Sequence, residues 1–138
     1  WLTERQEMLV LFCGINTLKT FSPRETPLNV KIQAFCQVLM DYCSAGHFEV
    51  YIRLMQEAKD FEDEKGMRLL EQATPMLQLN TEECVNFNDK YQSAEDCLEN
   101  LTELPLDLSH LGELLEQRFQ VEDELIEVIH TNHREQVA

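Results

Sequence analysis

The chain has 138 residues, which is the length of one domain and enough to bury a hydrophobic core. Its four glycines and four prolines are too few for the many turns of an all-β or α/β chain, so a mostly helical fold remains. The net charge of −15, from 11 basic and 26 acidic residues, disfavours direct binding to nucleic acid or to an anionic membrane and favours a cationic partner.

The sequence has no pattern typical of a membrane span or of a secretory leader. The longest nearly unbroken apolar run, Met8 to Ile15, is far shorter than the roughly 20 residues that cross a bilayer. The five cysteines are odd in number and form no Cys-x-x-Cys pair, so we expect free thiols that pack as small hydrophobes. We therefore expect a soluble, cytoplasmic protein. Because a helical pattern is already under way at Trp1, we expect the natural protein to begin further upstream.

The first half of the chain predicts three helices. The first carries apolar residues at helical spacing from Trp1 to Ile15 and is followed by a loop that ends in the cap-like pair Thr26-Pro27. The second runs from Leu28 to Cys43 with the most regular apolar stripe in the sequence. We expect Ser44-Ala45-Gly46 to end it at a short corner, after which a new stripe starts at Phe48.

The second half predicts an acidic linker at 57–65, followed by further helices. A short helix at 67–73 is expected to stop before the cap-like pair Thr74-Pro75, and a longer one carries the stripe from Leu77 to Leu98. A break at Leu104-Pro105 precedes a last helix from about Leu108 to His133. The prediction is an all-α, antiparallel helical bundle of four long helices and one short one, forming a single domain over residues 1–138.

Two histidines are candidates for a metal-binding or phosphotransfer role. Helical bundles can hold dinuclear metal sites built from paired Glu-x-x-His motifs, but Glu127 to His130 is a single copy and cannot supply the ligand set. His47 could be a phosphotransfer histidine, although the lysine and glycine that usually follow such a histidine are missing. We find no phosphate-binding loop and no nucleophile motif, and we expect no cofactor and no metal. A phosphocarrier or metal-carboxylate enzyme remains the alternative to a binding protein.

Two charged positions are unusual for a purely structural helix. Asp41 lies in the predicted last turn of its helix, where a carboxylate faces the negative end of the helix dipole at a cost of about 0.3–1 kcal/mol. Arg118 and Glu122 are four residues apart and fall within the apolar arc of the last helix. Each has two interpretations: Asp41 is a solvated aspartate or a partner contact, and Arg118–Glu122 is a buried ion pair or the border of a binding surface. For the pair we favour Arg118 as structural and Glu122 as closer to the partner.

The stretch from Phe35 to Tyr51 strongly resembles the bacterial regulator of sigma D family, Rsd, and its relative AlgQ. The specific part is Asp41-Tyr42-Cys43-Ser44-Ala45-Gly46-His47-Phe48, in which Cys43 stands where an aliphatic residue is expected. Trp1-Leu2 with Arg5, and Arg118-Phe119 with Glu122-Asp123, are similar to the family's opening and closing segments. The resemblance spans the chain, and family members carry a further N-terminal segment.

The resemblance implies an anti-sigma factor that binds region 4 of the primary sigma factor, sigma-70, one to one, and that is a monomer when free. Region 4 is a basic helix-turn-helix module, so its occlusion would remove contacts with promoter DNA and with core RNA polymerase and would shift transcription toward alternative sigma factors as growth slows into stationary phase. By the same resemblance the binding surface joins five residues: Asp41, Ser44, His47, Phe48 and Tyr51. Weaker additions are Trp1, Leu2, Arg5, Phe119 and Glu122. Helical phase directs Tyr51 toward the core.

Overall fold

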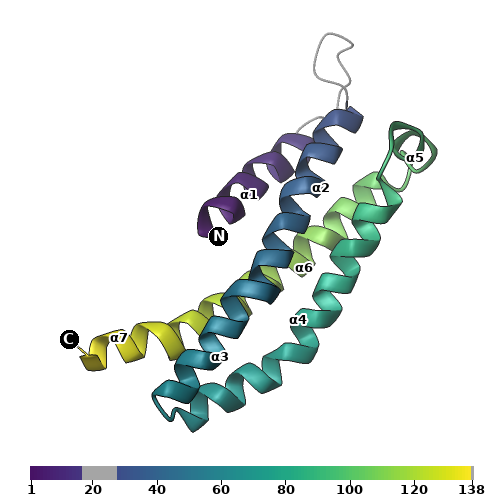
Figure 1. Cartoon of the computed structure of the whole chain (residues 1–138). Coiled ribbons are helices and arrows are strands. Elements are labelled where there is room, and N and C mark those ends of the chain that lie inside the picture. Colours follow the sequence, from purple (N-terminus) through teal and green to yellow (C-terminus); the bar gives the residue numbers. More distant parts are fainter. Residues whose placement is uncertain (17–27, 138) are drawn as a thin grey trace.

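The structure, a computed structural model, describes residues 1–16 and 28–137, with side chains up to residue 135. Within these residues every element is helical: α1 (Leu2–Asn16), α2 (Leu28–Ala45), η1 (Gly46–Val50), α3 (Tyr51–Asp60), α4 (Glu64–Lys90), α5 (Ala94–Glu99), α6 (Leu104–Leu125), η2 (Ile126–Thr131) and α7 (Asn132–Val137). The elements α2, η1 and α3 form one continuous helix, and α6, η2 and α7 form another (Figure 1). Together with α1 and α4 these make four long helices, and α5 is the short one. The predicted all-α bundle is confirmed for this part of the chain.

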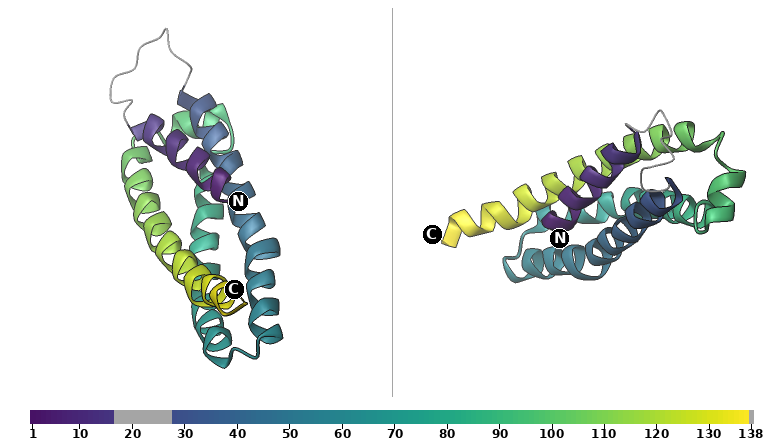
Figure 2. Two further views of the ribbon diagram at one scale, coloured as in Figure 1. Left: turned by 90° about the vertical axis from the view of Figure 1, so that its left-hand side faces the viewer. Right: turned by 90° about the horizontal axis from the view of Figure 1, so that it is seen from above.

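The bundle has two unequal halves because α1 is shorter than the other three long helices. Over one half, α1 packs against α2 and contacts α6, on the side of the bundle away from α4. Beyond α1, the segment α3, the start of α4 and the η2–α7 segment continue without a fourth helix (Figures 1 and 2). Each half has its own apolar core. The four-helix half buries residues such as Phe35, Leu39 and Leu111. The three-helix half buries a smaller set: Leu54, Ala58, Leu70, Leu77, Leu125 and Ile129.

The predicted corner at Gly46 is wrong, because the helix continues through it as the π-helical turn η1. Gly46 is buried, and no glycine in the described residues has a positive φ, so no left-handed terminator is formed. A π turn inserts one extra residue and rotates the helix beyond it by about 100°. This rotation keeps Tyr51 and Leu54 on the same side as Leu39, so the phase change in the apolar pattern is accommodated inside one helix.

Two further predicted breaks lie inside or close to helices. The linker shrinks to Phe61–Asp63, where Glu62 has φ 52° and the Asp63 side chain accepts a hydrogen bond of 2.8 Å from the Gly66 N–H. Pro75 lies within α4, so Thr74 is no cap, and its hydroxyl donates to the Leu70 carbonyl at 2.7 Å. Since proline has no N–H to donate, it weakens the helix locally, and α4 bends along its length (Figure 1).

The remaining boundaries shift by several residues. The predicted helix from Leu77 to Leu98 stops at Lys90, and Leu98 belongs to α5, which the Ser93 side chain caps. The break at Leu104-Pro105 is the start of α6, with proline in the first turn, and the last helix continues beyond His133. The predicted loop after α1 and the cap at Thr26-Pro27 lie outside the described residues. None of the described helices has the length and apolar character that a membrane crossing requires.

Candidate partner-binding site

A layer of buried polar side chains lies between the two apolar cores. At its centre are Arg118 and Glu122 of α6, whose side chains have no exposed surface and whose Nε and Oε2 atoms are 3.2 Å apart. The Arg118 guanidinium also donates to Asn80 Oδ1 at 3.2 Å and to Thr81 Oγ1 at 2.8 Å on α4. Its remaining nitrogen donates to the Tyr51 hydroxyl at 3.0 Å. The bonds of Arg118 therefore join three helices.

The carboxylate of Glu122 is covered by side chains from α1, α2 and α3. The Tyr42 hydroxyl donates to Oε1 at 2.5 Å, and the Tyr51 hydroxyl donates to Oε2 in a short hydrogen bond. Arg5 of α1 lies 3.4 Å from Oε1 and 2.7 Å from Asp123 Oδ1, and its Nε donates to the Tyr42 hydroxyl at 2.9 Å. Five elements, α1, α2, α3, α4 and α6, thus contribute to one polar layer.

The electrostatic surroundings keep Tyr42, Tyr51 and Arg118 protonated, so that each can donate hydrogen bonds. Burial raises the pKa of the Tyr42 and Tyr51 phenols, and the negative charge of Glu122 raises both further, so each keeps its proton. Burial alone would lower the pKa of Arg118, but the groups around it, Glu122 among them, raise it overall. A buried ion pair is stable when its remaining hydrogen-bonding groups are satisfied, as they are here.

These contacts bear on the two interpretations of Arg118 and Glu122, a buried ion pair or the border of a binding surface. Arg118 and Glu122 form a buried internal pair, and Glu122, at 1% exposure, does not lie at a surface where a partner could touch it. Glu122 is thus buried as deeply as Arg118, and this burial argues against the expected contact of Glu122 with a partner. Helical angles within α6 could not show this, because the covering hydroxyls come from Tyr42 and Tyr51, far away in the sequence.

The start of α1 closes the layer from outside. Trp1 stacks on Tyr42 with ring centroids 4.8 Å apart, and its Nε1 donates to the Tyr42 carbonyl at 3.1 Å. The Arg5 guanidinium lies 4.5 Å from the ring centre of Phe119, which is half-buried. Trp1, Arg5 and Phe119 are thus held in place by internal contacts, while Leu2 beside them is 57% exposed.

Four of the expected site residues lie together on the outside of the same long helix. We call Asp41, Ser44, His47 and Phe48 the exposed strip, because the side chains of all four are exposed. Asp41 accepts a hydrogen bond from the Gln37 side chain at 3.2 Å and forms no ion pair with any described cation. Phe48 is 69% exposed, and among the aromatic groups described its ring contacts only that of His47, nearly at a right angle. Because the helix continues to Asp60, Asp41 does not face a helix end, and the expected dipole penalty does not apply.

The two histidines of the alternative interpretation lie on different elements, His47 on η1 and His130 on η2. His47 is exposed on the strip, and its only described aromatic neighbour is Phe48. His130 Nδ1 lies 3.0 Å from Glu57 Oε2 on α3, which ties η2 to α3, while Glu127 is exposed. In the parts of the chain that the structure describes, no three histidine, cysteine or acidic side chains are grouped so that they could hold a metal ion.

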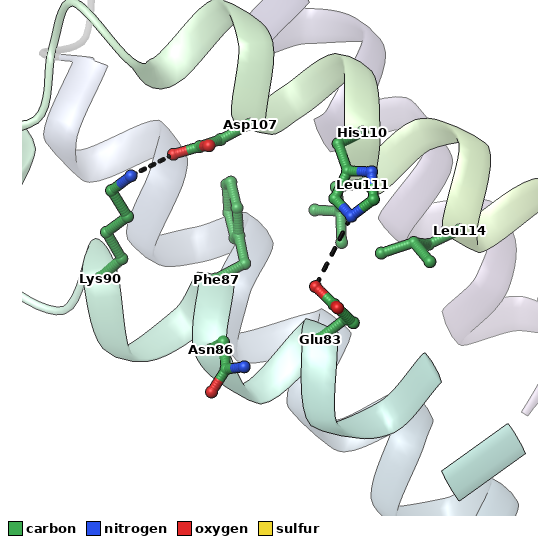
Figure 3. A pocket seen from close by; sticks show the side chains of 8 residues that line it. All are labelled: Glu83, Asn86, Phe87, Lys90, Asp107, His110, Leu111 and Leu114. Atoms are coloured by element: carbon green, nitrogen blue, oxygen red, sulfur yellow. Dashed lines mark ion pairs between the residues drawn. The ribbon is translucent and has the colours of Figure 1, made fainter. Parts of the chain in front are cut away.

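A small pocket in the four-helix half gathers acidic and basic groups. It lies between α4 and α6, has a volume of about 130 Å³, and is lined by Glu83, Lys90, Asp107 and His110 together with apolar side chains (Figure 3). Lys90 Nζ lies 2.8 Å from Asp107 Oδ2, and His110 Nε2 lies 3.5 Å from Glu83 Oε2. These groups are paired with one another, and the volume is below the 300 Å³ or so of a typical ligand pocket.

The sequence interpretation missed three members of the polar layer: Tyr42, Asn80 and Thr81. Asn80 falls on the apolar stripe that carries Leu77 and Cys84, and a polar residue on such a stripe signals a buried partner. Its Nδ2 donates to the Leu114 carbonyl at 2.7 Å. Tyr42 follows the same rule on α2, next to Asp41. Thr81 carried no comparable signal.

Comparisons with known proteins agree with one another. The family described as "Regulator of RNA polymerase sigma(70) subunit, Rsd/AlgQ" matches residues 1–130. Similar proteins named "Regulator of sigma D" include those of Yersinia pseudotuberculosis serotype O:1b (strain IP 31758), 38% identical over 92% of this chain and 75% of the relative, and Pectobacterium atrosepticum, 33% identical over 96% of this chain and 86% of the relative. No solved structure is matched.

Proposed function

Since this chain belongs to the Rsd/AlgQ family of regulators of the RNA polymerase sigma(70) subunit, we propose that it is an anti-sigma factor that binds region 4 of the primary sigma factor. It acts in the cytoplasm as a stoichiometric binding protein and not as an enzyme. One molecule of the chain occludes one region 4. The bound module then reaches neither promoter DNA nor core RNA polymerase, which leaves more core enzyme for alternative sigma factors.

The exposed strip is the observation that carries this proposal. It places a carboxylate without a described cationic partner, Asp41, on one helix face with an exposed aromatic ring, Phe48. Interfaces commonly combine such an aromatic anchor with a charge that finds its partner only in the complex. The opposite charge is supplied by the basic residues of a DNA-reading module, and the net charge of −15 steers the encounter.

The first test is binding itself. The full chain is mixed with isolated region 4 of the primary sigma factor, and the complex is examined by co-purification and native mass spectrometry. We expect a complex of one chain with one region 4 and no direct binding to promoter DNA. Failure to form that complex at micromolar concentrations would contradict the proposal.

The second test is Asp41→Ala, which should weaken binding at least about tenfold without loss of stability. The matched control is Asp60→Ala, because Asp60 is also exposed and also accepts from a glutamine four residues earlier, Gln56 Nε2 at 2.9 Å. Both variants lose one negative charge, so a general charge effect would weaken both equally. Titration calorimetry measures the affinities, and equal affinities for the two variants would remove Asp41 from the interface.

A further inference from the structure

A groove opens beside the exposed strip. It has a volume of about 470 Å³ and lies between α4 and the η1–α3 segment, in the three-helix half. Its apolar lining consists of Tyr51, Ile52, Met55, Leu70 and Leu77. Its polar lining consists of His47, Thr74, Gln78, Thr81 and Glu82.

Two features distinguish this groove from an ordinary gap between helices. Ile52 in its lining is 59% exposed, and Phe48, one helical turn earlier on the strip, is 69% exposed, so large apolar side chains face solvent at its edge. Its deep end is rigid, because Tyr51 and Thr81 both accept hydrogen bonds from the buried Arg118, at 3.0 and 2.8 Å. A groove that is already shaped requires less ordering when it binds a partner.

The groove is also continuous with the exposed strip. His47 belongs to both, and Tyr51 follows the strip along the same helix. The surface carries two carboxylates, Asp41 on the strip and Glu82 in the groove lining. An amphipathic basic helix fits this arrangement, with apolar side chains in the groove and lysine or arginine side chains toward the two carboxylates.

We propose that the groove between α3 and α4 receives apolar side chains from a helix of the basic sigma module, next to the contacts made by the exposed strip. This inference rests on the proposed function and extends the interface from the strip to Ile52 and Met55, neither of which was among the residues expected from the sequence. The groove supplies apolar contact area, and the strip supplies charge recognition.

The first measurement uses the unaltered chain. The five methionines are labelled with ¹³C in their methyl groups, and isolated region 4 is added. The Met55 methyl signal should shift on binding, because it lines the groove. Met76 is the internal control, since it is also half-buried but lines a different and smaller groove of about 230 Å³ between α4 and α6, and its signal should stay in place.

The second measurement compares Ile52→Glu with Leu106→Glu. Both replace an exposed apolar residue, 59% and 76% exposed, and both add one negative charge, but Leu106 lies on α6 near α5 and away from the groove. Ile52→Glu should weaken region 4 binding at least tenfold, whereas Leu106→Glu should bind like the unaltered chain. A denaturant melt checks that both remain folded, and if Ile52→Glu does not fold, the Met55 signal decides.

The outcomes separate this inference from the proposed function. If the unaltered chain binds region 4 and Asp41→Ala weakens binding, but the Met55 signal does not move or Ile52→Glu binds normally, the groove proposal is overturned and the proposed function stands. Equal losses in Ile52→Glu and Leu106→Glu would overturn it too. A Met55 signal that moves with the concentration of the chain alone would assign the groove to a second copy. If region 4 does not bind at all, both proposals fail together.

Discussion

The two halves of the bundle differ in how completely they are closed. In the four-helix half, α1 covers the core, and the pocket described there has a volume of about 130 Å³. In the three-helix half, grooves of about 470, 320 and 230 Å³ open beside α3, α4 and the η2–α7 segment. The same set of long helices therefore forms a closed core at one end and an open, groove-bearing surface at the other.

This difference explains the position of the polar layer. The apolar cover that α1 provides stops at the N-terminal end of this helix, where the side chains of Trp1 and Arg5 complete the buried layer that holds Arg118 and Glu122. Hydrogen bonds fix the geometry at this junction, where apolar packing has fewer neighbours. The exposed strip starts at the same level, because Asp41 and Tyr42 are adjacent on α2. The proposed interface thus begins where the bundle changes from four helices to three.

The largest expected effect comes from breaking the junction with Arg118→Ala. The variant leaves Glu122 buried beside two phenols with one cation fewer, and removing one partner of a buried ion pair costs about 3–5 kcal/mol. Urea denaturation of the purified chain gives the free energy of unfolding. A loss below about 1 kcal/mol, the level of exposed pairs, would show that the layer does not hold the halves together.

The double variant Arg118→Met with Glu122→Leu provides the control for that prediction. It removes both charges and replaces them with apolar groups of similar size, which in buried pairs is often neutral or stabilising. We expect the double variant to be more stable than Arg118→Ala. If both lose the same stability, the cost comes from lost packing volume and not from an unpaired charge.

The two cores should also respond differently to cavities. Leu39 is fully buried in the four-helix half, whereas Leu70 is 3% exposed and lines the open groove. Leu39→Ala should cost about 3–5 kcal/mol, and Leu70→Ala should cost about 2–3 kcal/mol, because the groove side can relax into the space that is left. Thermal and urea unfolding of both variants measure the difference. Equal losses would mean that the three-helix half is packed as rigidly as the other.

The number and character of the helices could be predicted from the sequence because apolar spacing is a local property. Their boundaries could not be predicted where a local signal competes with packing. Gly46 carries a helix-terminating signal, yet it is buried inside the helix, and the Tyr51 hydroxyl lies only 3.2 Å from where a Cβ would be, so a larger residue would crowd Tyr51. Pro75 likewise carries a start signal but is tolerated in a bent helix.

The candidate site was predictable only in part, for the same reason. The exposed members Asp41, Ser44, His47 and Phe48 are close in sequence, so one motif finds them together. The burial of Glu122 depends on Tyr42 and Tyr51, which lie 80 and 71 residues away in the sequence. The apolar periodicity of α6 cannot show contacts over such a distance. The groove is equally non-local, because its walls come from the η1–α3 segment and α4.

Tyr51→Phe is expected to have a smaller effect on the junction. It removes a hydroxyl that accepts from Arg118 and donates to Glu122, so two buried groups lose a partner at a cost of about 1–3 kcal/mol. The control is Tyr91→Phe, whose hydroxyl donates at 2.6 Å to Asp107, a carboxylate that keeps 30% of its side chain exposed. Water can replace that bond, so its loss should stay below about 1 kcal/mol. Similar losses in both variants would contradict a special role for the layer.

The smallest expected effect lies at the end of the three-helix half, where Asp63 caps α4. The hydrogen bond from the Gly66 N–H, supported by His133 at 2.8 Å, holds the pKa of Asp63 below its ordinary value of 3.8. Asp63→Ala should cost about 1 kcal/mol at neutral pH, a typical value for a lost N-cap. As the pH falls from about 5 through the lowered pKa, the unfolded chain takes up its proton first, so the contribution of the carboxylate to stability is lost.

The stability difference between the unaltered chain and Asp63→Ala should therefore be full above pH 5 and shrink below pH 3.8 as the carboxylate becomes protonated. Ser93→Ala is the matched control, because the Ser93 hydroxyl caps α5 by accepting from the Asp96 N–H at 3.1 Å and does not titrate in this range. Its cost should not change with pH. Urea melts of the three proteins from pH 3 to 7 make the comparison. A pH-independent cost for Asp63→Ala would show that the cap at this open end depends on geometry alone and owes nothing to the charge of the carboxylate.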